Sequence, residues 1–248
     1  MESNSEFASV IDTCSMINLS LYLEACEGAE LDLGSPSREV MEKLRKKSGS
    51  NNSIFEETYI KSGERVLDYL KSHSDWDIYF SVISKSEMYR TLSERLFDEL
   101  LTKAGIPFRI RKNKTARTEI RFDYEQEIIG RFGKLQKRLE ESEIVLIVPE
   151  SIDDIFQNVY DYLDAVASTI SLDVFDSYIY AVSIRVSARE LYSNDKEFVT
   201  IVNNIYHPPS NDWKQISKKL NQKIVKLHPF KDLESSDLPQ SFFPRGKP

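Results

Sequence analysis

Short apolar stretches alternate with longer helix-like segments through most of this 248-residue chain. The clearest stretch is residues 144–148, Ile-Val-Leu-Ile-Val, which ends at Pro149. Three other stretches of this kind lie at residues 7–11, 78–83 and 191–193. Apolar residues at successive positions are typical of strands that are buried on both faces of a sheet. Strands that alternate with helices predict an α/β fold, and we expect a three-layer α/β/α sandwich with a mainly parallel sheet.

The segments between these stretches have the amphipathic spacing or the capping residues of helices. We expect helices near residues 16–24, 36–47, 54–71, 84–103, 118–141, 153–167 and 172–188. The intervals 28–75 and 89–140 are rich in such segments, which predicts helical insertions into an α/β core. We expect one domain over residues 1–228, with an edge strand at 223–227. Four prolines and mixed charge predict an extended or disordered tail over residues 229–248.

The composition excludes several classes of protein. A net charge of −7 argues against a protein that coats nucleic acid through its overall charge. No apolar run approaches the ~20 residues that span a bilayer, and residues 1–6 lack the basic and then apolar profile of a secretory signal. Cys14 and Cys26 have no metal-ligand spacing, and the three histidines are scattered. We therefore expect a cytoplasmic protein with reduced thiols, no membrane partner and no zinc site.

Four acidic residues stand just after an apolar stretch or at the start of the helix that follows. They are Asp12, after residues 8–11; Glu87, after 78–83; Asp176, in the helix that opens near 171; and Asp195, after 190–193. In an open α/β sheet, ligands bind in the crevice outside the carboxyl ends of the strands. Carboxylates gathered there would repel one another and would require cations between them. The pattern therefore indicates a hard divalent metal and phosphate chemistry.

Each of these acids, taken alone, also has an ordinary structural interpretation. Acidic residues fill 40 of the 248 positions, so a single one carries little information. Residues 84–87, Ser-Lys-Ser-Glu, read as a helix capping box. Asp173 and Asp176 would also interact favourably with the positive end of a helix dipole. The functional interpretation depends on the set, and on the hydroxyls of Thr13 and Ser193, which can orient a ligand carboxylate.

At these residues the chain resembles the PIN-domain ribonucleases, the family that includes the VapC-type toxins. Residues 10–13, Val-Ile-Asp-Thr, look like the family's opening strand and first acid, and residues 83–87, Ile-Ser-Lys-Ser-Glu, look like its second. The most specific piece is the closing half, in which 175–181, Phe-Asp-Ser-Tyr-Ile-Tyr-Ala, precede 193–198, Ser-Asn-Asp-Lys-Glu-Phe. The matching parts cover about half of the chain.

The resemblance implies a PIN-like sandwich with helical insertions and the activity of a Mg²⁺- or Mn²⁺-dependent endoribonuclease. It implies that the catalytic and metal-binding acids are Asp12, Glu87, Asp176 and Asp195. Thr13, Asp173 and Ser193 would support these acids from behind, with Asp173 an extra ligand or a simple helix-start acid. Compact toxins of the family lack helical additions on this scale, and Tyr180 replaces a usually small residue. A toxin role, an antitoxin-like inhibitor protein and a homodimer therefore remain open.

A carboxylate site of this kind selects hard, oxygen-binding cations over zinc or copper. Such cations activate water for in-line attack on phosphate, so the protein needs no nucleophile of its own. No Ser–His or Cys–His pairing is apparent in the sequence. Two alternatives stay open: a catalytically degenerate PIN-like module that binds RNA or a protein partner, and a nuclease directed at DNA. The presence of all four acids favours the enzyme.

Residues 103–121 reverse the acidic balance of the chain. Seven basic residues occur there against one acid, Glu119, and Phe108 and Phe122 flank them. The expected RNA-binding residues are Arg109, Arg111, Lys112, Lys114 and Arg117. Such a segment predicts a surface that tracks phosphates and brings single-stranded RNA to the acidic site. A solvated loop, or a contact with an acidic partner, is the alternative that charge runs usually represent.

Overall fold

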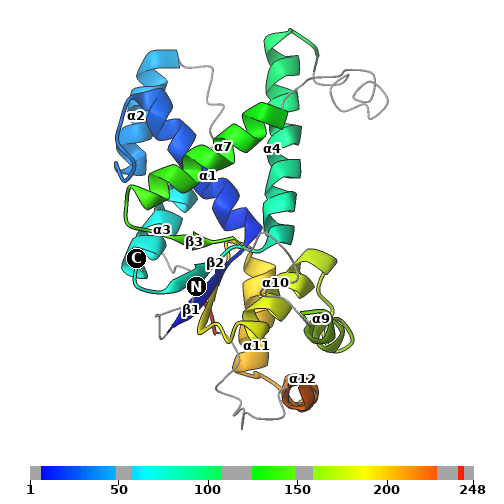
Figure 1. Ribbon diagram of the computed structural model, residues 1–248. Helices are drawn as coiled ribbons and strands as arrows, with labels where there is room; N and C mark the ends of the chain where they lie inside the picture. Colours follow the sequence, from blue (N-terminus) through cyan, green and yellow to red (C-terminus); the bar gives the residue numbers. More distant parts are fainter. Residues whose placement is uncertain (1–6, 49–56, 108–124, 149–158, 228–239, 243–248) are drawn as a thin grey trace.

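The computed structural model describes residues 7–48, 57–107, 125–148, 159–227 and 240–242. A parallel sheet in the order β3-β2-β1-β4 lies at its centre, and β5 extends it beyond β4 (Figure 1). The strands are β1 (Ala8–Ile11), β2 (Asp77–Tyr79), β3 (Leu146–Ile147), β4 (Glu190–Tyr192) and β5 (Gln240–Phe242). Every pair of neighbouring strands in this sheet runs parallel. The structure therefore confirms the predicted α/β fold with a parallel sheet.

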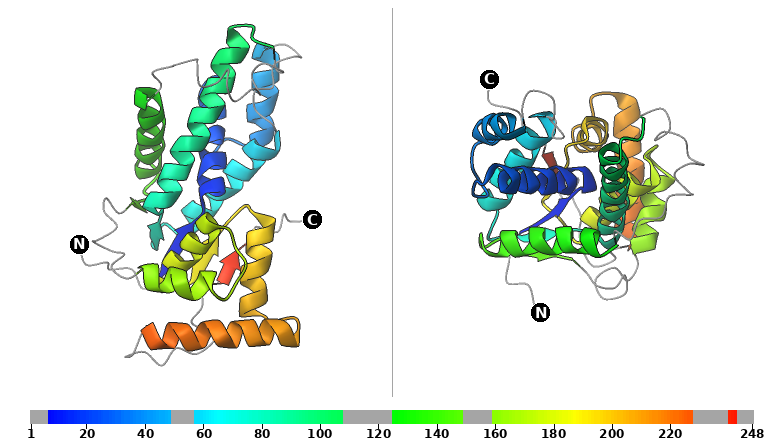
Figure 2. Two further views of the ribbon diagram at one scale, coloured as in Figure 1. Left: turned by 90° about the vertical axis from the view of Figure 1, so that its right-hand side faces the viewer. Right: turned by 90° about the horizontal axis from the view of Figure 1, so that it is seen from above.

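Helices cover both faces of the sheet, as a three-layer sandwich requires. Those in the described ranges are α1 (Thr13–Ala29), α2 (Ser37–Ser48), α3 (Glu57–Ser72), α4 (Val82–Lys103), α7 (Glu125–Glu140), α9 (Val159–Ala167), α10 (Val174–Arg185), α11 (Lys196–Tyr206) and α12 (Asn211–Leu227). The first five extend away from one side of the sheet, and α9 to α12 gather on the other (Figures 1 and 2). No helix of the described chain is long and apolar enough to cross a bilayer.

Two predictions about the end of the chain are corrected by the structure. The segment 223–227 is not an edge strand, because it forms the last turns of α12. Leu220 and Ile224 are buried at the spacing of one helical turn, so the apolar face of α12 continues through this segment. In the expected tail, residues 240–242 form β5 and pair with β4; its other residues lie outside the described ranges.

The strand expected at 78–83 ends early. β2 stops at Tyr79, and Ser81 is the N-cap of α4. The Ser81 hydroxyl accepts a hydrogen bond from the Ser84 backbone N–H at 3.0 Å and donates one to the Ser84 hydroxyl at 2.8 Å. The capping box predicted at 84–87 is therefore wrong. Glu87 lies one turn further into the helix than that box would place it.

Alternate residues of the strands face two separate apolar cores. Ile11 and Tyr192 point to the core that contains α1, α3 and α7, whereas Val10 and Leu191 point to the core that contains α10, α11 and α12. This alternation follows from the two-residue repeat of a strand. Both faces are apolar, which explains why the strands read as continuous apolar stretches in the sequence.

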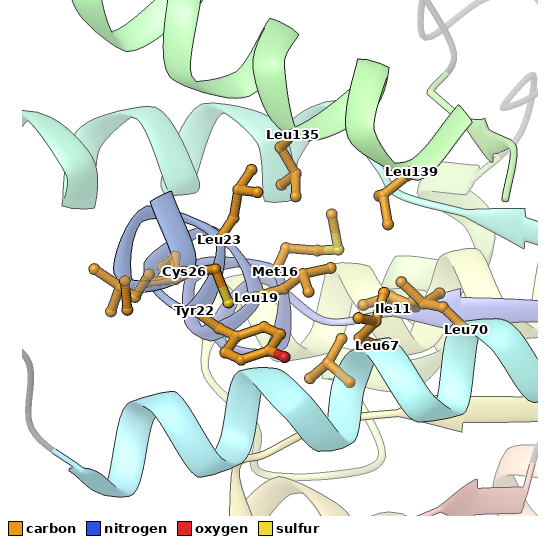
Figure 3. Packing of buried hydrophobic residues seen from close by; sticks show 14 of the residues in the cluster. Ile11, Met16, Leu19, Tyr22, Leu23, Cys26, Leu67, Leu70, Leu135 and Leu139 are labelled. Carbon is orange, nitrogen blue, oxygen red and sulfur yellow. The ribbon is translucent and has the colours of Figure 1, made fainter. Parts of the chain in front are cut away.

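Helix α1 runs through the middle of the first core. Thirteen of its seventeen residues are buried. Figure 3 shows Met16, Leu19 and Leu23 of α1 between Leu67 of α3 and Leu135 of α7. A helix that is buried on nearly all sides needs apolar neighbours all round, and the helical segments within the expected insertions supply them. These segments therefore hold α1, whose N-cap is Asp12, in place.

Gly63 permits a close contact between α1 and α3. The sequence predicts a weak point in the helix at this glycine, but α3 continues through it. A Cβ atom at position 63 would lie 2.2 Å from the Asn18 carbonyl oxygen and 2.5 Å from the Tyr22 Cβ. No side chain fits this space unless the two helices move apart. The glycine thus serves the packing of the helices.

We expect Gly63→Ala to lower the free energy of unfolding by about 1–2 kcal/mol, because overpacking exceeds the gain in helix propensity. Gly133→Ala in α7 is the matched control, since a Cβ there meets nothing within 4 Å. It should stabilise the protein by about 0.5–1 kcal/mol. Urea unfolding monitored by circular dichroism measures both changes. Equal stabilisation by the two substitutions would contradict the close contact.

Candidate functional site

Asp12 and Asp195 lie side by side at the carboxyl end of the sheet. Asp12 follows β1 and is the N-cap of α1, and Asp195 follows β4 and is the N-cap of α11. The strands β1 and β4 are neighbours in register, with Ile11 opposite Tyr192. The Asp12 backbone N–H continues the ladder by donating to the Tyr192 carbonyl at 3.0 Å. The segments that follow β1 and β4 therefore both enter a helix at the same edge of the sheet.

Ser193 joins these two acids. Its hydroxyl donates to Asp12 Oδ2 at 2.5 Å and accepts from the Asp195 backbone N–H at 2.9 Å. Asp12 Oδ1 accepts from the Cys14 backbone N–H at 3.1 Å, so both oxygens of this carboxylate are held in place. The predicted supporting position of Ser193 thus corresponds to a direct hydrogen bond with the first acid.

Asp195 is held through one oxygen. Its Oδ1 accepts from the backbone N–H groups of Glu197 and Phe198, at 2.8 and 3.1 Å. Within the described residues, Oδ2 makes no hydrogen bond. A carboxylate with one oxygen anchored and one unengaged can present the second oxygen to a ligand.

Glu87 and Asp176 approach the same region from two other helices. Glu87 lies in the second turn of α4, and Asp176 lies in the first turn of α10. Asp173 is the N-cap of α10 and accepts from the Asp176 backbone N–H at 2.8 Å. This exposed cap is the structural role that the sequence left open for Asp173; whether it also contacts a ligand stays a prediction.

The acids influence one another's ionisation, which shows that they share one region. Burial raises the pKa of Asp12 to about 6 against the opposing hydrogen bonds from Ser193 and Cys14, and the charges of Glu87 and Asp195 raise it further. Asp12 is only 3% exposed. Burial likewise raises the pKa of Asp176 to about 7, and four negative neighbours add to this shift. These neighbours are Asp173, Asp12, Asp195 and Glu87.

Cys14, also beside these acids, is not suited to act as a nucleophile. Cys14 is exposed, but partial desolvation by the surrounding chain raises the pKa of its thiol to about 12, and the charges of the same four predicted acids raise it further. The thiolate is the reactive form of cysteine, so a thiol held protonated is inert at neutral pH. The carboxylates, and not this thiol, are therefore the candidate functional groups at this edge of the sheet.

In the described part of the chain, no basic side chain forms an ion pair with the carboxylates of this cluster. Among the described residues, no Lys or Arg lies within 4.0 Å of the carboxylates of Asp12, Glu87, Asp176 or Asp195. The side chains are also not drawn together: no three Asp, Glu, His or Cys side chains in these ranges surround one point closely enough to hold a metal.

The donor set fits a hard divalent cation. It consists of carboxylate oxygens from four elements, which Mg²⁺ and Mn²⁺ prefer over nitrogen or sulfur ligands. Two buried polar atoms next to the acids, Thr13 Oγ1 and Asn194 Nδ2, also have no hydrogen-bond partner among the described residues. Such atoms in a folded protein usually face a bound water or ligand. The support of the acids by Thr13 stays a prediction, because its hydroxyl contacts none of their carboxylates in the described residues.

The sequence did not reveal the contact of Ser15 with the loop after β4. The Ser15 hydroxyl accepts from the Asn194 backbone N–H at 3.1 Å across 179 positions of sequence, and so holds the Asp195 loop against α1. The hydroxyls of Thr13 and Ser15 are visible in the sequence as possible capping groups, but the sequence does not show that Ser15 contacts the Asn194 backbone. The predicted RNA-binding residues lie outside the described ranges; they are Arg109, Arg111, Lys112, Lys114 and Arg117.

Comparisons of the chain with protein-family models, with curated proteins and with solved structures found no significant match. The geometry alone therefore characterises the site. The chain is an α/β protein with a parallel sheet, in which Asp12 and Asp195 follow two neighbouring strands while Glu87 and Asp176 approach from α4 and α10.

Proposed function

We propose that this protein is a metal-dependent endoribonuclease of the PIN type. The observation that carries the proposal is the carboxylate cluster of Asp12, Glu87, Asp176 and Asp195, which has no positive partner in the described chain. Keeping a buried carboxylate such as Asp12 ionised without compensation is costly. A divalent cation removes that cost, and a cation among carboxylates is a common solution for phosphodiester hydrolysis.

The four acids would hold Mg²⁺ or Mn²⁺ through oxygen atoms alone. When bound, such a cation lowers the pKa of water and offsets the negative charge that develops on the reacting phosphate. The chain contributes orientation: Ser193 holds Asp12 while α11 holds Asp195, so neither carboxylate must reorganise. Asp12 is buried at the end of β1, which limits the access of bulk water to its carboxylate.

The PIN resemblance supports the same assignment from the sequence. The acids at 12 and 195 follow two adjacent parallel strands, as the resemblance of residues 10–13 and 193–198 implies. RNA is the expected substrate from this resemblance, and the basic residues between 109 and 117 are expected to guide it. The large helical additions around α1 make a compact toxin a poor comparison, so we do not extend the proposal to an inhibitor partner.

A cleavage assay combined with a binding assay tests the proposal. We expect the native protein to cut mixed-sequence single-stranded RNA in Mn²⁺ or Mg²⁺ and not in EDTA. We also expect each cation to raise the Tm, because binding to the folded state stabilises it. Cleavage that persists in EDTA would contradict the proposal. If neither cation changes the Tm and no RNA is cut, the protein is a non-cutting module instead.

A further inference from the structure

A cation–π pair lies beside the acidic cluster. The guanidinium carbon of Arg90 in α4 is 5.8 Å from the centre of the Phe175 ring in α10. Arg90 follows Glu87 by three positions in α4, and Phe175 directly precedes Asp176 in α10. The pair therefore joins the same two helices that bring Glu87 and Asp176 to the cluster.

Arg90 is exposed, and no carboxylate of the described residues pairs with it. Glu87 and Glu94 lie three positions before it and four after it in α4, which is the spacing of helical ion pairs. Even so, Arg90 makes no ion pair within 4.0 Å anywhere in the described ranges. A guanidinium without a carboxylate partner can contact a phosphate with its planar set of donors.

Phe175 adds an apolar surface to this position. It is only partly buried, and its neighbour Val174 is 74% exposed. Val174 and Phe175 are two adjacent apolar side chains at the start of a helix, next to several carboxylates. Exposure of their apolar surface to water costs free energy, which a ligand that covers them would recover. An aromatic ring in this position can stack on the face of an unpaired base.

We propose that Arg90 and Phe175 form a nucleotide-binding contact that selects single-stranded RNA at the acidic site. Phe175 stacks on an unpaired base while Arg90 contacts an adjacent phosphate, which places the backbone next to Glu87 and Asp176. A base within a duplex is already stacked and paired, so its face cannot reach the ring. This role rests on the function proposed above, because it assigns the substrate of the same site.

The test measures RNA binding and cleavage by Arg90→Ala, Arg90→Lys and Phe175→Leu. Fluorescence anisotropy with a short single-stranded RNA and with the matching duplex gives the affinities, in Mn²⁺ and in EDTA, and steady-state cleavage gives KM and kcat. Arg95→Ala is the matched control. Arg95 lies in the same helix and stacks over Tyr59 of α3, with 5.1 Å from its guanidinium carbon to the ring centre.

We expect Arg90→Ala and Phe175→Leu each to weaken binding of the single strand about tenfold and to raise KM similarly. Duplex affinity and Tm should stay unchanged, as should all properties of Arg95→Ala. Arg90→Ala should also reduce the slope of log K against log salt by about 0.7, and Arg90→Lys should restore that slope. Because affinity is measured apart from cleavage, this inference can fail while the native protein cuts RNA, and the converse also holds.

Three results would overturn the assignment. The first is native affinity for the single strand in both Arg90→Ala and Phe175→Leu. The second is an equal loss of affinity for duplex and single strand, which would indicate general charge attraction. The third is a loss of affinity that is accompanied by a lower Tm and that Arg90→Lys does not restore. That result would mean that the pair only stabilises the packing of α4 against α10.

Discussion

Asp12→Asn and Asp195→Asn should each lower kcat/KM for metal-dependent RNA cleavage by about 100-fold or more. Asparagine has nearly the same shape as aspartate but no charge, so it should bind a divalent cation poorly. It is also a good helix N-cap, which lets α1 and α11 begin at the same residues. The loss should therefore appear in activity and metal affinity rather than in folding.

The control for this experiment is Asp161→Asn. Asp161 is an exposed acid in the first turn of α9 and does not contribute to the raised pKa of Asp12 or Asp176. This variant should cleave RNA like the native protein. Circular dichroism checks that all three variants are folded. Cleavage at the native rate by both Asp12→Asn and Asp195→Asn would reject the acidic cluster as the active site.

The metal-free protein should become less stable as the pH rises from about 4 to 8. The pKa of Asp12 is about 6 in the folded protein and 3.8 in a model compound, so the folded state binds the proton more tightly. The corresponding stability is present at low pH and is lost as the pH rises through about 6. A shift of this size corresponds to about 3 kcal/mol from Asp12 alone. Asp176, with a pKa of about 7, contributes in the same direction at slightly higher pH.

Asp176→Asn tests the origin of this pH dependence. The Asp176 side chain accepts no hydrogen bond within the described residues, so its replacement removes mainly the charge. At pH 8 in EDTA, the variant should be more stable than the native protein by about 1–2 kcal/mol, after allowance for its partial exposure. At pH 5 the difference should be less than half as large, because Asp176 is ionised in the unfolded protein but still protonated in the folded one. Urea unfolding at both pH values measures the difference.

Addition of Mg²⁺ at pH 8 should reverse this order. The cation stabilises the native protein by binding to the ionised acids, whereas Asp176→Asn lacks one of the proposed ligands and should gain less. A native protein that is equally stable at pH 5 and pH 8 in EDTA would mean that the carboxylates of Asp12 and Asp176 are not buried as described. The pH profile thus tests the geometry without an activity assay.

The expected loss of activity and the expected gain in metal-free stability have the same physical cause, the uncompensated charge of the acids. A cluster of acids that destabilises the metal-free protein is typical of a functional site, where activity is gained at the expense of stability. Replacement of Asp176 is expected to improve stability and to remove activity. The second core, which buries α10, α11 and α12, supplies the apolar packing that offsets the cost.

Local sequence patterns predicted most elements but misassigned some boundaries. The stretch 78–83 is apolar throughout, and both the end of a strand and the start of a buried helix satisfy that pattern. Only the hydrogen bonds of Ser81 show that the chain changes to helix there. The segment 223–227 was misread because five residues are too few to distinguish strand from helix spacing. Gly63 looked unfavourable because its neighbour across the core, Asn18, is 45 positions away in the sequence.

The sequence by itself determined that acids follow β1 and β4, because strand-forming stretches and turns are encoded by adjacent residues. It also determined the parallel sheet, since each strand is followed by a helix that returns the chain to the opposite edge. Only the tertiary structure decided that β1 and β4 are neighbours, that Ser193 bridges Asp12 to the Asp195 backbone, and that Arg90 lies over Phe175. It also decided the raised pKa values of Asp12 and Asp176. These properties depend on contacts and burial between distant segments, and no local pattern specifies them.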